Sequence, residues 1–177
     1  MLFNSWTFWL FFAVVLPVYW LLPFRAQTFF ILGASYFFYG WWDWRFLPLI
    51  AFSTVMDFYL GLLVASAPSD KAKRRYVWLS VATNLALLGF FKYYNFFTAE
   101  VVEALNAVGL DVSPPLIQVI LPVGLSFYTF QSMSYVFDIY QKTAQPARSF
   151  LDFACYVALF PQLIAGPIVK YRDVSDR

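Results

Sequence analysis

Polar side chains and helix-breaking residues interrupt two apolar stretches near the C-terminal end of this sequence. The first stretch is LPVGLSFYTFQSMSYVFDIYQ, from Leu121 to Gln141, and the second is ALFPQLIAGPIVKYRD, from Ala158 to Asp173. Polar groups and irregular backbone persist at membrane depth only when they are buried in protein or line a water-filled cavity. The two stretches therefore predict a site rather than a simple anchor. Its candidate residues are Tyr128, Gln131, Ser134, Tyr135 and Asp138 in the first stretch, and Gln162, Gly166, Pro167, Lys170 and Arg172 in the second.

The candidate residues of the first stretch share one face of a helix. At about 100° per residue, Tyr128, Gln131, Ser134, Tyr135 and Asp138 fall on an arc of roughly 120°. One interpretation is the polar wall of a substrate passage, and the acid Asp138 favours it. The alternative is attachment between helices through hydrogen bonds worth roughly 0.6 kcal/mol each. The sequence leaves both interpretations open.

The second stretch also contains residues that interrupt a helix. Gln162, Gly166 and Pro167 indicate an interrupted helix that exposes amides and carbonyls to a cavity. Lys170 and Arg172 follow it, at a cytoplasmic mouth that an anionic substrate can approach. The alternative is a kinked helix with ordinary cations that anchor it at the membrane interface.

The composition predicts an integral membrane protein with an all-α fold. Of 177 residues, 62% are hydrophobic, 23% are aromatic and only 12% are charged, about half the charged share of soluble domains. A net charge of +2 gives no reason to expect a nucleic-acid partner. The sequence has no histidine and one cysteine, Cys155, so it predicts neither a metal centre nor an intrachain disulfide.

Charge and hydropathy patterns predict a polytopic transmembrane helix bundle formed by residues 1–177 as a single membrane domain. Basic residues after the first apolar run and between residues 71 and 75 belong in the cytoplasm, which places the N-terminus outside. A polar, amphipathic helix from Ala99 to Leu110 is expected to lie in the outer interface. Phe150 to Ala165 is expected to be a broken or re-entrant segment. About five spans are predicted, from Trp6 to Leu22, Thr28 to Trp42, Phe46 to Ser66, Tyr76 to Phe97, and Leu116 to Tyr140.

One carboxylate lies deep in the third predicted span. Asp57 is roughly 16 Å from the outer end of that span at 1.5 Å per residue, where an unpaired charge is costly. Asn84 reaches a similar depth on the fourth span, and Lys92 lies nearer the outer surface. We expect a contact between Asp57 and Asn84, or a longer reach to Lys92, as a structural rather than catalytic interaction.

The amino-acid sequences of the two stretches resemble those of a known family. FYTFQSMSY, from Phe127 to Tyr135, and FPQLIAGPIVKYRD, from Phe160 to Asp173, resemble the bacterial branch of the membrane-bound O-acyltransferases, typified by alginate O-acetyltransferases. The resemblance covers most of the chain and corresponds to the N-terminal portion of considerably longer enzymes. In that family a histidine within the membrane is the base, and it lies beyond the matched part. No residue of this chain takes that role by motif, so we assign no catalytic residue here.

The resemblance implies that acetyl groups pass across the bacterial inner membrane to O-acetylate an exported polysaccharide such as alginate. Acetyl-coenzyme A or another acyl donor would be a co-substrate rather than a bound cofactor. The implied partners are the lipid bilayer, the remaining C-terminal part of the fold, and periplasmic proteins that accept the acetyl group.

Two other functions remain open on the sequence alone. The chain can be a non-catalytic or truncated membrane subunit, because it lacks the expected base. It can also be a small transporter or channel, since those proteins use broken helices and polar stripes as well. A transporter of that type predicts pseudo-symmetric halves, which the sequence does not display.

Overall fold

The described part of the molecule is helical and contains no strand, which confirms the all-α class. The computed structural model describes residues 5–110, 112–113, 119–122, 124–164, 169–171 and 173; Gly166, Pro167 and Arg172 lie outside them. The helices are α1 (Trp6–Leu21), α2 (Phe24–Asp43), the short 3-10 helix η1 (Trp44–Phe46), α3 (Leu47–Ser66), α4 (Asp70–Ala107), α5 (Leu125–Tyr140), α6 (Phe150–Ala158) and α7 (Phe160–Ile164).

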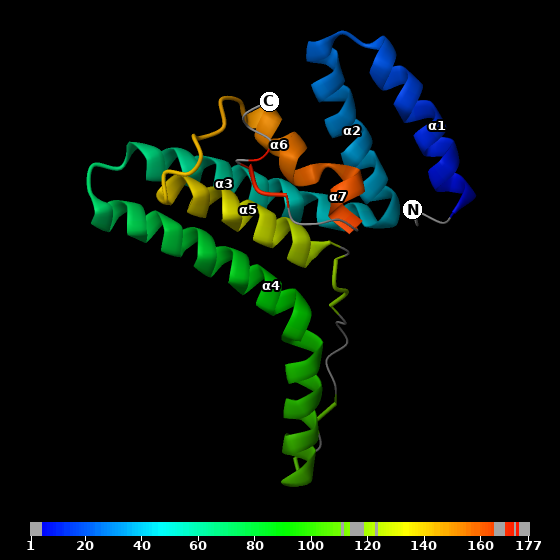
Figure 1. The fold of residues 1–177 in the computed structure, drawn as a ribbon. Coiled ribbons are helices and arrows are strands. Elements are labelled where there is room, and N and C mark those ends of the chain that lie inside the picture. Colours follow the sequence, from blue (N-terminus) through cyan, green and yellow to red (C-terminus); the bar gives the residue numbers. More distant parts are fainter. Residues whose placement is uncertain are drawn as a thin grey trace.

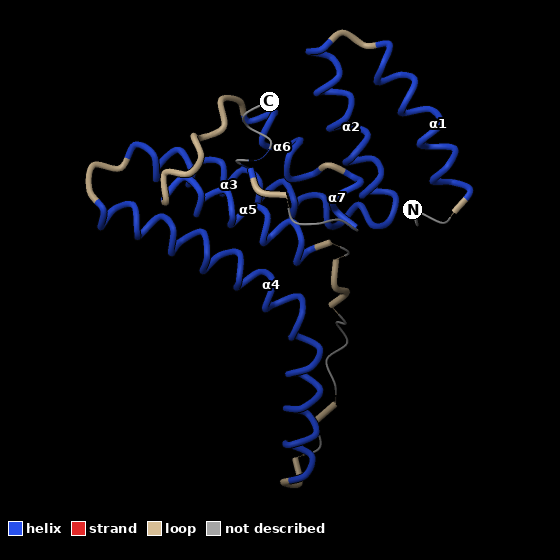
Figure 2. Tube along the Cα trace, in the orientation of Figure 1, coloured by secondary structure: helices blue, strands red, loops and turns tan. Residues whose placement is uncertain are grey.

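The helices form two groups that meet at α6 and α7. Helices α3 and α5 and the first part of α4 lie side by side, while α1 and α2 form a hairpin at a steep angle to them (Figure 1). The second part of α4 turns away and projects from the other helices (Figure 2). The arrangement therefore differs from a simple bundle of parallel spans.

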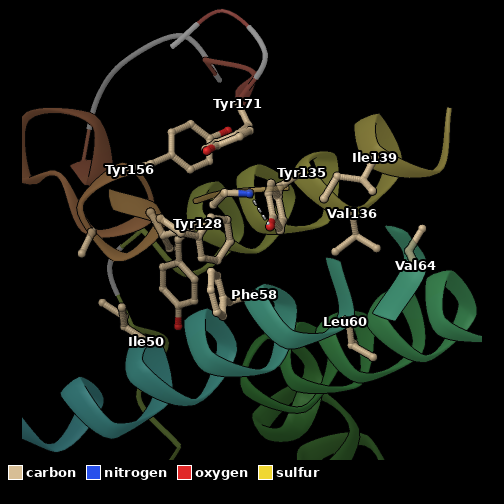
Figure 3. Packing of buried hydrophobic residues seen from close by; sticks show 14 of the residues in the cluster. Ile50, Phe58, Leu60, Val64, Tyr128, Tyr135, Val136, Ile139, Tyr156 and Tyr171 are labelled. Carbon is tan, nitrogen blue, oxygen red and sulfur yellow. Dashed lines mark hydrogen bonds between the residues drawn. The ribbon is translucent and has the colours of Figure 1, made fainter. Parts of the chain in front are cut away.

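Helices α3 and α5 approach closely because a glycine faces a tyrosine. Tyr135 of α5 is fully buried, and a Cβ placed on Gly61 of α3 would lie 2.8 Å from the Cζ and Oη atoms of that ring. The Tyr135 hydroxyl accepts a hydrogen bond from the backbone N–H of Ala147 at 3.1 Å (Figure 3). Its ring centroid lies 4.3 Å from that of Phe153 and 4.9 Å from that of Tyr171. Tyr135 thus connects α3, α6 and the segments that flank α6.

Helix α5 begins directly after Pro122 and Gly124, two of the helix-breaking residues in the first apolar stretch. Gly124 precedes the helix with a φ of 79°, a left-handed conformation that glycine adopts without steric cost. The backbone N–H of Leu125 donates to the carbonyl of Pro122 at 3.2 Å, which closes the turn. Residues 116–118, the first part of the predicted span, lie outside the described residues.

Helix α4 corrects the prediction of a span ending at Phe97 and a separate interfacial helix from Ala99. The structure has one continuous helix of 38 residues from Asp70 to Ala107. The predicted boundary followed a change from apolar to polar side chains, but backbone hydrogen bonds of a helix do not depend on that change. Helix α4 continues through Thr98, whose hydroxyl donates to the carbonyl of Tyr94 at 2.8 Å.

The helix within Phe150 to Ala165 is interrupted, although before Gln162, which the sequence indicated as part of the break and which lies within α7. Leu159 leaves the helical conformation, with φ −57° and ψ 113°, and separates α6 from α7. The break frees the backbone N–H of Phe160, which donates to the Ser35 hydroxyl of α2 at 3.2 Å. That hydroxyl in turn donates to the carbonyl of Ile31 at 2.7 Å. A polar side chain of α2 therefore compensates for the interruption.

Within the described residues, one helical stretch is long and apolar enough to cross a membrane. It runs from Phe24 to Ser66 and comprises α2, η1 and α3. Helix α1 and the helical residues Phe150–Gln162 are apolar but shorter.

The contact between Gly61 and Tyr135 predicts that adding one methyl group at Gly61 destabilises the protein. Gly61→Ala should lower the free energy of unfolding by about 1–3 kcal/mol, because the new Cβ overlaps a buried ring. Gly89→Ala is the matched control, since a Cβ at that helical position meets no atom within 4 Å. The control should gain up to about 1 kcal/mol from helix propensity. Unfolding in detergent, followed by circular dichroism, measures both, and equal stabilisation by the two variants would contradict the packing.

Candidate functional site

A buried carboxylate connects the three principal helices. Asp57 of α3 has no exposed surface and accepts hydrogen bonds from the Ser80 hydroxyl at 2.6 Å and the Asn84 amide at 2.8 Å, both on α4. The Ser132 hydroxyl of α5 donates to the same carboxylate. The predicted contact between Asp57 and Asn84 is therefore present, within a larger network.

The network also satisfies the other polar atoms of Asn84. Its amide nitrogen donates to the backbone carbonyl of Ser80 at 3.0 Å, and its amide oxygen accepts from the Ser53 hydroxyl at 3.1 Å. The side chains of Ser53, Ser80, Asn84 and Ser132 are all buried. Because every donor around Asp57 comes from the protein interior, this carboxylate holds helices together and is not presented to a substrate.

Lys92 does not take part in this network. Its side chain is exposed, and its Nζ lies 5.5 Å from the centroid of the Tyr93 ring. Of the two partners that the sequence offered for Asp57, the structure therefore has Asn84 and not Lys92. Ser80 and Ser132 were not expected from the sequence, although Ser80 lies one helical turn before Asn84 and so faces the same side of α4.

The two interrupted apolar stretches, Leu121 to Gln141 and Ala158 to Asp173, contact each other through a pair of glutamines. The amide nitrogen of Gln131 on α5 donates to the backbone carbonyl of Tyr156 on α6 at 2.8 Å. The same nitrogen lies 3.4 Å from the side-chain oxygen of Gln162 on α7. The Tyr156 hydroxyl donates to the carbonyl of Val169 at 2.7 Å, which connects the second stretch to the same cluster. Residues selected from separate parts of the sequence thus share one location.

Ser134 and Tyr135 have structural partners. The Ser134 hydroxyl donates at 2.7 Å to the carbonyl of Gln131 on its own helix. Tyr135 packs among Phe153, Tyr156 and Tyr171, as Figure 3 shows for the three tyrosines. These contacts are those expected of residues that join helices.

Tyr128 and Asp138 are different, because each carries a buried polar atom without a hydrogen-bond partner among the described residues. These atoms are the Tyr128 hydroxyl and Oδ2 of Asp138; both side chains are buried. The other carboxylate oxygen of Asp138 lies 3.4 Å from the Thr143 hydroxyl. An unsatisfied buried polar group costs about 1–3 kcal/mol, so such atoms normally await a partner. Among the described residues, these two atoms are the buried side-chain oxygens without a hydrogen-bond partner.

Of the remaining candidates, Lys170 is exposed, and Gly166, Pro167 and Arg172 fall outside the described residues. The Cys155 thiol donates to the backbone carbonyl of Thr28 at 3.2 Å. Among the described residues, no group of three or more His, Cys, Asp or Glu side chains could hold a metal ion. The arrangement brings amide and hydroxyl groups together, but the chain has no histidine to activate a hydroxyl as a base.

Comparison with known proteins confirms the resemblance inferred from the sequence. The whole chain is 40% identical to the probable alginate O-acetylase AlgI of Azotobacter vinelandii, of which it covers 36%, and 39% identical to that of Pseudomonas aeruginosa, of which it covers 34%. Over 81% of its length it is 32% identical to the peptidoglycan O-acetyltransferase of Helicobacter pylori, covering 31% of that protein. The chain spans about a third of the length of these relatives and matches the N-terminal portion of the alginate O-acetylases. No family model and no solved structure matches it.

The network around Asp57 predicts a large loss of stability when the carboxylate is removed. Asp57→Ala should cost at least about 3 kcal/mol, because three buried donors lose their acceptor. Ser132→Ala, which removes one donor only, should cost about 1 kcal/mol. Thermal unfolding in detergent measures both variants.

Asp43→Ala is the matched control for this experiment. Asp43 also accepts hydrogen bonds, but its partners are the exposed guanidinium of Arg45 at 2.6 Å and the backbone N–H of the same residue at 3.0 Å. Ion pairs in contact with solvent contribute little to stability, and loss of the helix-capping bond costs about 1 kcal/mol, so the control should be destabilised much less than Asp57→Ala. If Asp57→Ala unfolded no earlier than Asp43→Ala, the central role of the network would be refuted.

Proposed function

We propose that this chain is the N-terminal part of a membrane-bound O-acyltransferase that passes acetyl groups across the membrane to O-acetylate an exported polysaccharide. The observation that carries the proposal is the 40% identity to a probable alginate O-acetylase over the entire chain. Alginate is the favoured polymer, because the identity to the peptidoglycan O-acetyltransferase is lower. The meeting of Gln131 and Gln162 supports a shared site for the two stretches.

In this proposal the residues of this chain line the substrate path, and the C-terminal part of the fold provides the catalytic base. Acyl transfer to a hydroxyl requires a base near the attacking oxygen, a donor site, and groups that stabilise the developing oxyanion. The free Tyr128 hydroxyl and the Asp138 carboxylate offer hydrogen bonds to the substrate path, and the two glutamines shape it. The histidine base belongs to the C-terminal part that completes the site.

The proposed location is the bacterial inner membrane, which the chain crosses several times with its N-terminus outside. Helices α2 and α3 have 20 residues each, or about 30 Å, which matches the hydrocarbon thickness of a bilayer. Helix α4 is long enough to cross and continue beyond the membrane. The break between α6 and α7 suits a re-entrant segment that returns to the cytoplasmic side.

Acetyl-coenzyme A or another acyl donor would approach from the cytoplasm, near Lys170 and Arg172. Periplasmic proteins would receive the acetyl group and complete its transfer to the polysaccharide. The direction of this chemistry gives a physical reason to build a site through the bilayer.

A second candidate function is a non-catalytic membrane subunit. The observation that favours it is the absence of histidine, so no residue of the chain can replace the family's base. A subunit of this kind would support acetylation only when a separate protein provides that base.

Acetylation of exported polysaccharide tests the proposed function. Deleting the gene should abolish most acetyl esters on the polymer, measured by proton NMR, and reintroducing the unmodified gene should restore them. Reintroduced Gln131→Leu should restore much less, because it loses the bonds to Tyr156 and Gln162.

Gln141→Leu is the control in this experiment, since Gln141 is exposed at the end of α5. It should restore acetylation fully. Unchanged acetyl content after the deletion would refute a role in acetylation.

The proposed orientation makes a separate prediction about α4. In a Cys155→Ala background, Lys71→Cys should react with a membrane-impermeant maleimide only after the cells are permeabilised. Glu103→Cys should react in intact cells, because α4 carries it to the outer side. Both positions are exposed on the protein surface, so burial does not limit labelling. Labelling of the two positions from the same side would exclude a crossing by α4.

A further inference from the structure

A hollow of about 210 Å³ lies where α3 ends, α4 begins and α5 gives way to the following loop. It lies at the C-terminal end of α5, whereas the Gln131–Gln162 pair joins the middle of that helix to α7, and it has a different character. Its apolar lining includes Val64 and Ile139, which are buried side chains (Figure 3). Its polar lining includes Lys73, Lys142 and Gln145.

The two lysines give the hollow a positive charge that the protein neutralises only weakly. The Nζ of Lys73 lies 3.7 Å from an oxygen of Asp70, whose side chain is 95% exposed to solvent. Among the described residues, no carboxylate lies within 4 Å of the Lys142 ammonium. Lys71, Arg74 and Arg75 on the first turns of α4 add to the positive potential.

The backbone of Lys142 is unusual and provides an independent observation. Its φ is 61°, in the left-handed region, and its N–H donates to the carbonyl of Ile139 at 3.0 Å as α5 ends. Glycine is the usual residue after a helix in this conformation, because a β-carbon is strained there. The chain instead carries a lysine, which is one of the residues that line the hollow. Strain of this kind concentrates where a side chain is needed for function.

We propose that this hollow is a binding site for a phosphate group, held between the ammonium groups of Lys73 and Lys142. Lysine ammonium groups bind phosphate as compact charges, and basic pockets between helices near the cytoplasmic membrane surface accept anionic lipid headgroups. The phosphate comes either from an anionic phospholipid, whose acyl chains contact the apolar surface around the hollow, or from a soluble molecule. The site does not depend on acetyl transfer, and its test requires no enzymatic activity.

Native mass spectrometry of the full chain, released from detergent with added lipid, tests the site. The lipid probes are phosphatidylglycerol, which has a net negative headgroup, and phosphatidylcholine, which is neutral overall. Inorganic phosphate, added without lipid, is the soluble probe. Lys73→Gln and Lys142→Gly should each reduce retention of the bound probe about fivefold, which corresponds to the loss of one cation.

Two features of the variants separate binding from folding. Lys142→Gly relieves the left-handed strain, so its unfolding temperature should be equal to or above that of the unmodified protein. Lys71→Gln removes the same charge from the same basic segment but from a residue outside the hollow, so retention of the probe should fall much less than in the two hollow variants.

The outcomes distinguish the two sources of phosphate. Preferential retention of phosphatidylglycerol that both variants lose supports a lipid site. Retention of inorganic phosphate with the same dependence on the two lysines supports a site for a soluble phosphate. Equal effects of Lys71→Gln and the two hollow variants, or equal retention of both lipids with no phosphate bound, would overturn the proposal.

Discussion

The burial of one carboxylate constrains the whole arrangement of helices. Asp57 lies in the interior between α3, α4 and α5, and it is stable there because three side chains donate hydrogen bonds to it. A buried charge without such donors would cost several kcal/mol, so the three helices cannot slide or rotate independently. The close approach of α3 and α5 at Gly61 and Tyr135 depends on the same alignment.

Helix α5 contacts different helices on different sides, and the Asp57 network fixes one of these sides. Ser132 faces the Asp57 network, and Gln131, the preceding residue, faces α6 and α7 on another side. Both ends of the helix are marked by left-handed residues, Gly124 before it and Lys142 shortly after it. Glycine adopts that conformation freely, whereas lysine does not. The conformation of Gly124 before α5 is therefore explained by the backbone alone. After α5, the same conformation is adopted by a charged residue, Lys142, beside the hollow.

Two buried polar atoms of α5 have no hydrogen-bond partner among the described residues. Tyr128 and Asp138 present buried oxygen atoms that no described residue binds. Both lie on the same helix as the residues that are fully satisfied, so the difference reflects the surroundings of each position. An interior normally satisfies its polar groups, so these two atoms mark a hydrogen-bonding capacity of α5 that the described residues do not use.

The sequence by itself determined the helical class, the break before α5, the break between α6 and α7, and the contact of Asp57 with Asn84. Proline, glycine and a deep carboxylate act through local backbone geometry and solvation, which are readable along one chain. The tertiary structure alone decided that α4 continues past Phe97, that Ser80 and Ser132 complete the carboxylate network, and that Lys73 and Lys142 share a hollow. Serine and lysine are common residues without a distinctive spacing, and their roles arise only when folding brings separate helices to within a few ångströms.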